Sequence, residues 1–141
     1  MEDIKNTSPK KKVMIVEDDA FVMDIYETKL LEEGYEVLEA NNGMEGYKKL
    51  EAGNIPDLIL LDIVMPYMDG MELLRKIKTN DKFKTIPIIL LTNLSQKEDI
   101  DLGLGMGAED YLIKSQFTPS EVFKKIKELL ARKEQDEENK K

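Results

Sequence analysis

The sequence predicts an α/β fold built on a doubly wound parallel sheet of five strands. Two observations carry this prediction: short apolar runs alternate with segments whose hydrophobic residues recur at helical spacing, and this alternation repeats five times, which is typical of parallel strands covered by helices. The three most continuously apolar runs are placed at the centre of the sheet, which gives the order 2-1-3-4-5. The runs that we interpret as strands are Val13–Glu17, Tyr35–Ala40, Leu58–Asp62, Ile88–Thr92 and Tyr111–Lys114.

Helix boundaries agree with this flavodoxin-like, three-layer α/β/α arrangement. Gly34, Gly53 and Gly107 are expected at helix ends, where a left-handed residue is needed, and Gly103–Gly107 is interpreted as a loose helix end. Residues 1–10 are expected to be flexible, residues 11–132 to form one domain, and residues 133–141 to be a charged, disordered tail. Four segments pair a capping residue with a glutamate three positions later, namely Asn42–Glu45, Asp69–Glu72, Ser95–Glu98 and Thr118–Glu121.

Composition excludes several classes of function. Lys and Arg total 21 against 29 Asp and Glu, so the net charge of −8 disfavours binding to nucleic acid or to anionic membranes. The chain has no cysteine and no histidine, which excludes disulfides, thiolate chemistry and a phosphohistidine of its own. The opening residues contain no apolar stretch typical of a signal peptide, so a cytoplasmic protein is expected.

Acidic residues follow two strands that the predicted topology places side by side. Glu17, Asp18 and Asp19 end the first strand, and Asp62 ends the third. Clustered carboxylates repel one another unless a pKa rises or a cation joins them, and carboxylates suit Mg²⁺, for which Mn²⁺ could substitute. Alternatively, Asp18 or Asp19 caps the first helix and Asp62 begins a turn.

Two further polar residues end the fourth and fifth strands. Thr92 supplies a hydroxyl and Lys114 a cation at the same edge of the sheet. A phosphoryl group on Asp62 could therefore be stabilised by Mg²⁺, by Lys114, and by Thr92 together with the backbone N–H of Asn93.

Four motifs in this order resemble the response-regulator receiver domain. They are "VEDD" after the first strand, "DIVMPYMDG" after the third, "LT" ending the fourth and "GAEDYLIK" in the fifth, and the resemblance covers residues 11–132. It implies that Asp62 accepts phosphate from a phosphohistidine, with Asp18 and the backbone carbonyl of Val64 as metal ligands and Glu17 acting through water. It also implies that Thr92 and Tyr111 form a switch pair.

The resemblance implies partners as well. A histidine kinase or a histidine phosphotransfer protein would supply the phosphate. A downstream protein would bind the face formed by the helix after Ser95, strand 111–114 and the helix after Thr118. The protein is expected to be a monomer or a phosphorylation-dependent dimer, and a phospho-acceptor rather than an enzyme.

The sequence departs from the family pattern in two places. Ser115 stands where the family usually has a proline preceded by a cis bond, so the Lys114–Ser115 bond is either strained or trans. Asn93 replaces the usual small residue.

A degenerate receiver that acts only as an interaction module is therefore the second interpretation. An aspartyl-nucleophile phosphatase is disfavoured, because Val64 stands where a second Asp is needed. A flavodoxin-like binder is disfavoured by the anionic loop after the first strand.

Overall fold

The computed structural model describes residues 10–63, 69–92 and 97–139. Its single sheet consists of β1 (Lys12–Val16), β2 (Glu36–Ala40), β3 (Leu58–Asp62), β4 (Ile88–Thr92) and β5 (Asp110–Ile113), all parallel, in the order β2-β1-β3-β4-β5. The predicted strand order is thus confirmed, and the bounds of β3 and β4 are those predicted. The other three strands differ from the prediction by one residue at one or both ends.

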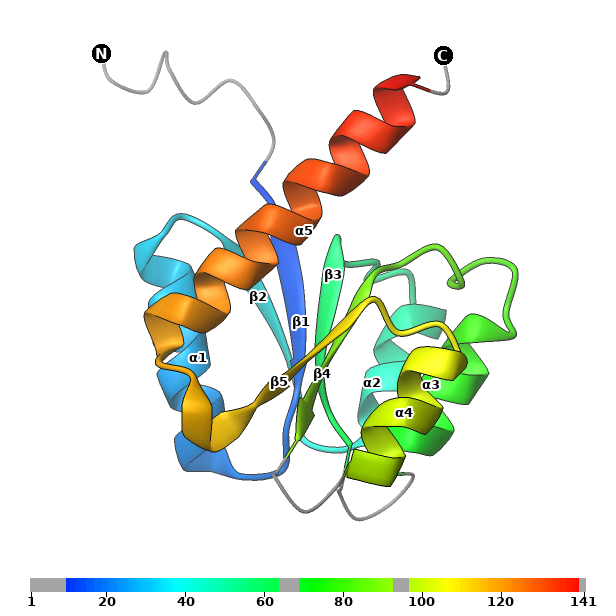
Figure 1. The fold of residues 1–141 in the computed structure, drawn as a ribbon, viewed down its shortest axis with the longest axis horizontal. Coiled ribbons are helices and arrows are strands. Elements are labelled where there is room, and N and C mark those ends of the chain that lie inside the picture. Colours follow the sequence, from blue (N-terminus) through cyan, green and yellow to red (C-terminus); the bar gives the residue numbers. More distant parts are fainter. Residues whose placement is uncertain (1–9, 64–68, 93–96, 140–141) are drawn as a thin grey trace.

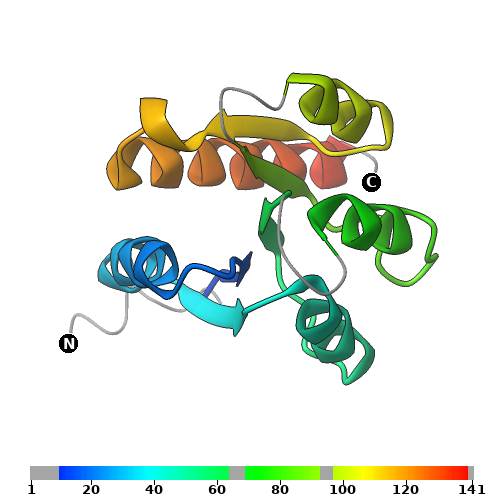
Figure 2. The same ribbon diagram turned by 90° about the horizontal axis from the view of Figure 1, so that it is seen from below.

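Helices cover both faces of the sheet (Figure 1). One face is covered by α1 (Ala20–Glu32) and α5 (Pro119–Asn139), and the other by α2 (Gly43–Glu51), α3 (Gly70–Lys78) and α4 (Lys97–Gly105). Seen along the sheet in Figure 2, the strands form the central layer between these two helical layers. None of the described helices is long and apolar enough to cross a membrane.

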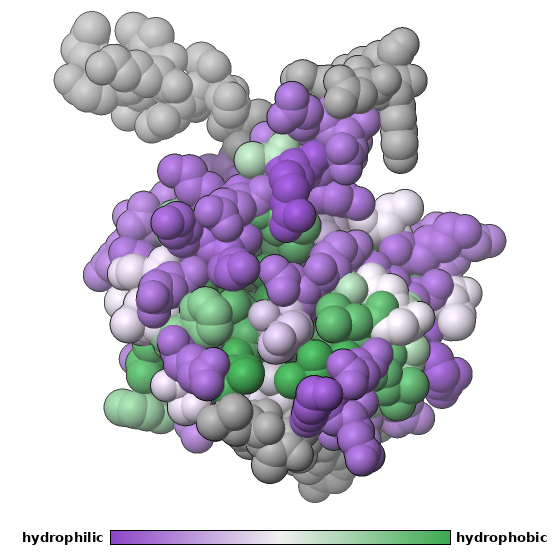
Figure 3. All heavy atoms as spheres, in the orientation of Figure 1, coloured by the Kyte–Doolittle hydropathy of each residue, from purple (hydrophilic) through white to green (hydrophobic). Residues whose placement is uncertain are grey.

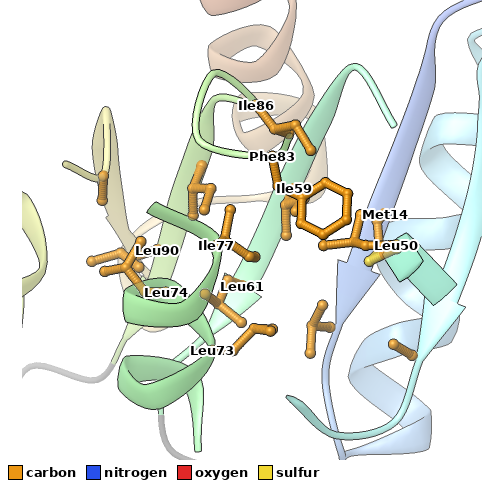
Figure 4. Packing of buried hydrophobic residues seen from close by; sticks show 14 of the residues in the cluster. Met14, Leu50, Ile59, Leu61, Leu73, Leu74, Ile77, Phe83, Ile86 and Leu90 are labelled. Atoms are coloured by element: carbon orange, nitrogen blue, oxygen red, sulfur yellow. The ribbon is translucent and has the colours of Figure 1, made fainter. Parts of the chain in front are cut away.

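The central strands are apolar because they are buried on both sides. Every residue of β3 and β4 is buried, and alternate side chains enter opposite halves of the core. Leu58 and Leu60 pack with α1 and α5, whereas Ile59 and Leu61 pack with α2 and α3. Figure 4 shows the second half of the core, in which Phe83 and Met14 lie close to Ile59 and Leu50.

The helix ends follow the predicted signals within the described residues. Asn42 and Asp69 each accept a hydrogen bond from the backbone N–H three residues later, and Thr118 and Glu121 form a reciprocal capping box. Gly34, Gly53 and Gly107 all have positive φ, as predicted. The predicted cap at Ser95 lies outside the described residues.

The C-terminal helix differs from the prediction of a disordered tail at residues 133–141. The structure continues α5 to Asn139, and Figure 1 shows its last turns extending beyond the sheet. Glu, Lys, Arg and Gln are strong helix formers, so loss of the apolar period does not end the helix. A contact of 2.6 Å between Lys11 Nζ and Glu134 Oε2 joins this extension to the chain preceding β1.

Candidate functional site

The register of the sheet assembles a polar cluster at the carboxyl ends of the strands. Val16 pairs with Leu61, so the next residues, Glu17 and Asp62, leave neighbouring strands at the same level. Carboxylate oxygens of Glu17, Asp18 and Asp62 all lie within 4.8 Å of one another. Glu17 is 1% exposed and Asp62 is 5% exposed, whereas Asp18 faces solvent.

Lys114 brings a positive charge to this cluster. Its Nζ lies 2.9 Å from Glu17 Oε1 and 3.2 Å from Asp62 Oδ2. Lys114 directly follows β5 and begins the short 3-10 helix η3 (Lys114–Gln116). No peptide bond among the described residues is cis, so the bond to Ser115 is trans, and Lys114 reaches both acids with this geometry.

Burial changes the protonation of these groups. Burial and the charge of Asp62 raise the pKa of Glu17 to about 7, although Lys114 acts in the opposite direction. Burial disfavours the charge of Lys114, but its hydrogen bonds and its attraction to Glu17 and Asp62 raise its pKa overall. The lysine therefore stays charged, and Glu17 is the group that gives up charge near neutral pH.

The three consecutive acids after β1 do different things. Asp19 caps α1, because its Oδ1 accepts hydrogen bonds from the backbone N–H groups of Phe21 and Val22 at 2.9 and 3.2 Å. The helix-cap alternative is therefore correct for Asp19. Glu17 and Asp18 lie instead beside Asp62.

This donor set suits a hard divalent cation. Mg²⁺ prefers oxygen ligands and is usually held by one or two carboxylates together with waters. Asp18 and Asp62 can supply those carboxylates. Burial disfavours the charged form of Glu17, and a cation nearby would stabilise that form. The residues present thus fit Mg²⁺.

The structure describes two of the four remaining predicted site residues, Thr92 and Tyr111. Thr92 is fully buried at the end of β4, and its pairing partner Ile113 directly precedes Lys114. Tyr111 lies on β5 and is 38% exposed. The predicted roles of Val64 and Asn93 fall outside the described residues.

One residue near the site was given no role from the sequence. Gly70, the first residue of α3, lies against the backbone of Asp62 and Ile63. Its signal was available in the sequence, because a glycine directly after a capping aspartate weakens the helix that it begins.

Comparison with known proteins agrees with the fold. Residues 13–127 match the family described as the response regulator receiver domain. The chain is 36% identical over 124 residues to the alkaline phosphatase synthesis transcriptional regulatory protein PhoP of Bacillus subtilis, covering 88% of this chain and 50% of that protein. It is 39% identical over 123 residues to the probable transcriptional regulator ycf27 of Guillardia theta, covering 87% of this chain and 46% of that protein. The chain thus spans about half the length of these relatives.

Solved structures resemble the chain over most of its length. A CheY-like response regulator receiver domain protein from Methanospirillum hungatei superposes with a TM-score of 0.83 at 34% identity, covering 91% of this chain and 99% of that one. A putative response regulator from Chloroflexus aurantiacus gives a TM-score of 0.81 at 33% identity, covering 87% and 99%.

Proposed function

Because the chain belongs to the response regulator receiver domain family, we propose that Asp62 accepts a phosphoryl group from a phosphohistidine donor in a Mg²⁺-dependent reaction. The observation that carries this proposal is the position of the Asp62 carboxylate. It lies at the carboxyl edge of the sheet, within 4.8 Å of the carboxylates of Glu17 and Asp18 and 3.2 Å from the Lys114 ammonium. A carboxylate so placed can act as a nucleophile whose product carries charge that nearby groups neutralise.

The reaction transfers one phosphoryl group between two proteins. A carboxylate oxygen of Asp62 attacks phosphorus, the new O–P bond forms, and the P–N bond to the donor histidine breaks. The electron pair of that bond stays on the imidazole nitrogen. The chain has no histidine, so the donor must be another molecule: a histidine kinase or a histidine phosphotransfer protein.

Each neighbouring group has a proposed part in this reaction. Bound Mg²⁺ would neutralise charge on the transferring group. Asp18, Asp62 and the Val64 carbonyl would hold it, and Glu17 would act through water; Mn²⁺ could take its place. Lys114 would neutralise a second phosphoryl oxygen, and the Thr92 hydroxyl with the Asn93 N–H would bind the third.

Phosphorylation is proposed to act on the face formed by α4, β5 and α5. Thr92 and Tyr111 would reorient together, and Tyr111 is exposed enough to move. Figure 3 shows hydrophobic residues on both sides of β5 on this face, and Leu102 and Leu104 of α4 are exposed. A downstream protein is proposed to bind there.

The remaining expectations are part of the same proposal. The chain would be a phospho-acceptor rather than an enzyme, cytoplasmic, and a monomer or a phosphorylation-dependent dimer. The relatives are named as transcriptional regulators. We nevertheless propose no nucleic-acid or membrane contact for the residues of this chain, because its net charge is −8.

The proposal is tested by intact-mass measurement after incubation with acetyl phosphate and Mg²⁺. The wild type should gain the mass of one phosphoryl group, whereas Asp62→Asn should gain none, and a chelator should abolish the gain. Asp57→Asn is a matched control, because Asp57 lies at the opposite end of β3 and accepts a hydrogen bond from Lys12 N there. A folded wild type that gains no phosphate under these conditions would contradict the proposal and favour a degenerate receiver that only binds partners.

A further inference from the structure

Gly70 is in direct contact with the main chain of the proposed phospho-acceptor. A Cβ atom built on Gly70 would lie 2.2 Å from the carbonyl oxygen of Asp62 and 2.4 Å from the Cα of Ile63. Both are backbone atoms, so they cannot rotate away as the end of a side chain could. Any residue other than glycine must therefore displace either α3 or the end of β3.

Backbone conformation does not explain the glycine. The glycines of positive φ among the described residues are Gly34, Gly53 and Gly107, and Gly70 is not one of them. Helix propensity does not explain it either, because alanine would favour the first turn of α3 more than glycine does. The close approach to Asp62 is the physical reason that remains.

The surrounding contacts make this approach rigid. On one side, the N–H of Ile63 donates to the carbonyl of Leu91 on β4 at 3.2 Å. On the other, α3 is capped by Asp69, whose Oδ1 accepts from Glu72 N at 2.9 Å, and the helix is anchored by the fully buried Leu73. The main chain of Asp62 is thus held between a neighbouring strand and the start of a helix.

We propose that Gly70 is a positioning residue for phosphoryl transfer, an inference that rests on the proposed function of Asp62. Its contact fixes the main chain at residues 62 and 63, and so holds the acceptor carboxylate among Asp18, Glu17 and Lys114. Transfer reactions depend steeply on the placement of the nucleophile, so a displacement of about 1 Å at Asp62 would slow the reaction strongly.

The first test compares Gly70→Ala with Gly105→Ala. Gly105 also lies in a helix, but a Cβ there would meet no atom within 4 Å. With acetyl phosphate and saturating Mg²⁺, and at a temperature where circular dichroism shows all three proteins folded, Gly70→Ala should be phosphorylated at least tenfold more slowly than wild type. Gly105→Ala should stay within twofold of it.

A second readout separates positioning from a merely structural role. In ¹H–¹⁵N NMR spectra of the proteins without phosphodonor, Gly70→Ala should shift the amide signals of Asp62, Ile63 and Leu91, and should speed hydrogen exchange of the Ile63 amide. A purely structural glycine would lower stability and shift these signals, but would leave the phosphorylation rate of the folded protein unchanged. That result would overturn the proposal.

A pair of cap variants decides the question if Gly70→Ala does not fold. Asp69→Ala and Asn42→Ala each remove one N-cap hydrogen bond, of 2.9 and 2.8 Å, but only Asp69 adjoins Gly70. Asp69→Ala should slow phosphorylation at least threefold more than Asn42→Ala does, and Asp69→Asn, which keeps a cap without the charge, should restore most of the rate. Equal rates for the two alanine variants would overturn the proposal. If the wild type itself accepts no phosphate, the proposed function fails first, and the positioning role falls with it.

Discussion

The ammonium nitrogen of Lys114 lies 3.2 Å from Oδ2 of Asp62, so the cation that follows β5 contacts the carboxylate that ends β3. The same nitrogen lies 2.9 Å from Glu17 Oε1. Lys114 is therefore the counter-charge of two buried acids. Its role in stability can be separated from its proposed role in phosphoryl transfer.

We expect Lys114→Ala to destabilise the metal-free protein at pH 8, where Glu17 is ionised, because two buried carboxylates then lose their counter-charge. The expected loss in the free energy of unfolding is about 3 kcal/mol. The matched control is Lys125→Ala: Lys125 contacts Asp110 at 3.7 Å with a side chain that is 41% exposed. Its loss should be below about 1 kcal/mol. Urea unfolding with a chelator present measures both, and equal losses would show that the buried acids do not depend on Lys114.

The raised pKa of Glu17 predicts a pH dependence of stability. Burial raises this pKa from 4.5 to about 7 in the folded protein. Between these values the unfolded chain has released the proton while the folded protein still holds it, so the folded state binds more protons and its stability falls as pH rises. The contribution is full below pH 4.5 and lost above about 7, and it amounts to at most about 3 kcal/mol.

Glu17→Gln isolates this effect. The difference in free energy of unfolding between the wild type and Glu17→Gln, measured by urea unfolding in chelator, should fall between pH 4.5 and about 7. A control is needed because a hydrogen bond with Glu39 also raises the pKa of Glu27 to about 7. Glu27→Gln should leave the Glu17 difference unchanged. Glu27 on α1 interacts with Glu39 on β2, whereas Glu17 interacts with Lys114 and Asp62. A flat difference across this range would mean that Glu17 is ionised in the folded protein.

Packing of α4 on the sheet gives a prediction away from the polar cluster. A Cβ on Gly103 would lie 2.5 Å from Leu90 Cδ1, so Gly103→Ala should cost about 1–3 kcal/mol by overpacking. Gly105→Ala, in open space on the same helix, should be neutral or stabilising by up to about 1 kcal/mol. Thermal and urea unfolding distinguish these outcomes, and a stabilising Gly103→Ala would show that Leu90 moves aside without cost.

The sequence was sufficient for the sheet because β3 and β4 are buried on both faces, and a continuous apolar run has few other interpretations. The strands that were misplaced by a residue each begin with a polar residue, namely Lys12, Glu36 and Asp110, for which periodicity gives no boundary. At the C-terminus, the structure continues α5 to Asn139, through residues that were predicted to be a disordered tail. The high charge of this segment was taken to indicate disorder. Glutamate is, however, a strong helix former, and Glu134 pairs with Lys11, which lies 123 positions earlier in the chain.

The polar cluster was predictable only as a convergence. Strand order places Glu17, Asp62 and Lys114 at one edge of the sheet. The distances between their side-chain atoms also depend on how segments far apart in the sequence pack, and strand order does not give these distances. The trans bond before Ser115 could not be chosen from the sequence, because both isomers were compatible with it. Gly103 was interpreted as part of a loose helix end, whereas the structure buries it inside α4 against Leu90. The presence of a glycine does not by itself distinguish a close approach from a turn, since glycine serves both.

Binding of Mg²⁺ to the acidic cluster should stabilise the folded protein. At a concentration one hundred times the dissociation constant, a ligand that binds only the folded state adds about 2.7 kcal/mol to the free energy of unfolding. Asp18→Asn should lose most of this gain, because it removes one of the carboxylates that lie within 4.8 Å of one another. Asp19→Asn is the matched control, since Asp19 caps α1 through Phe21 N and asparagine caps equally well. Thermal unfolding of the three proteins with and without Mg²⁺ measures the difference. If Asp19→Asn lost the stabilisation and Asp18→Asn kept it, the cation would have to lie beside the start of α1 and away from Asp62.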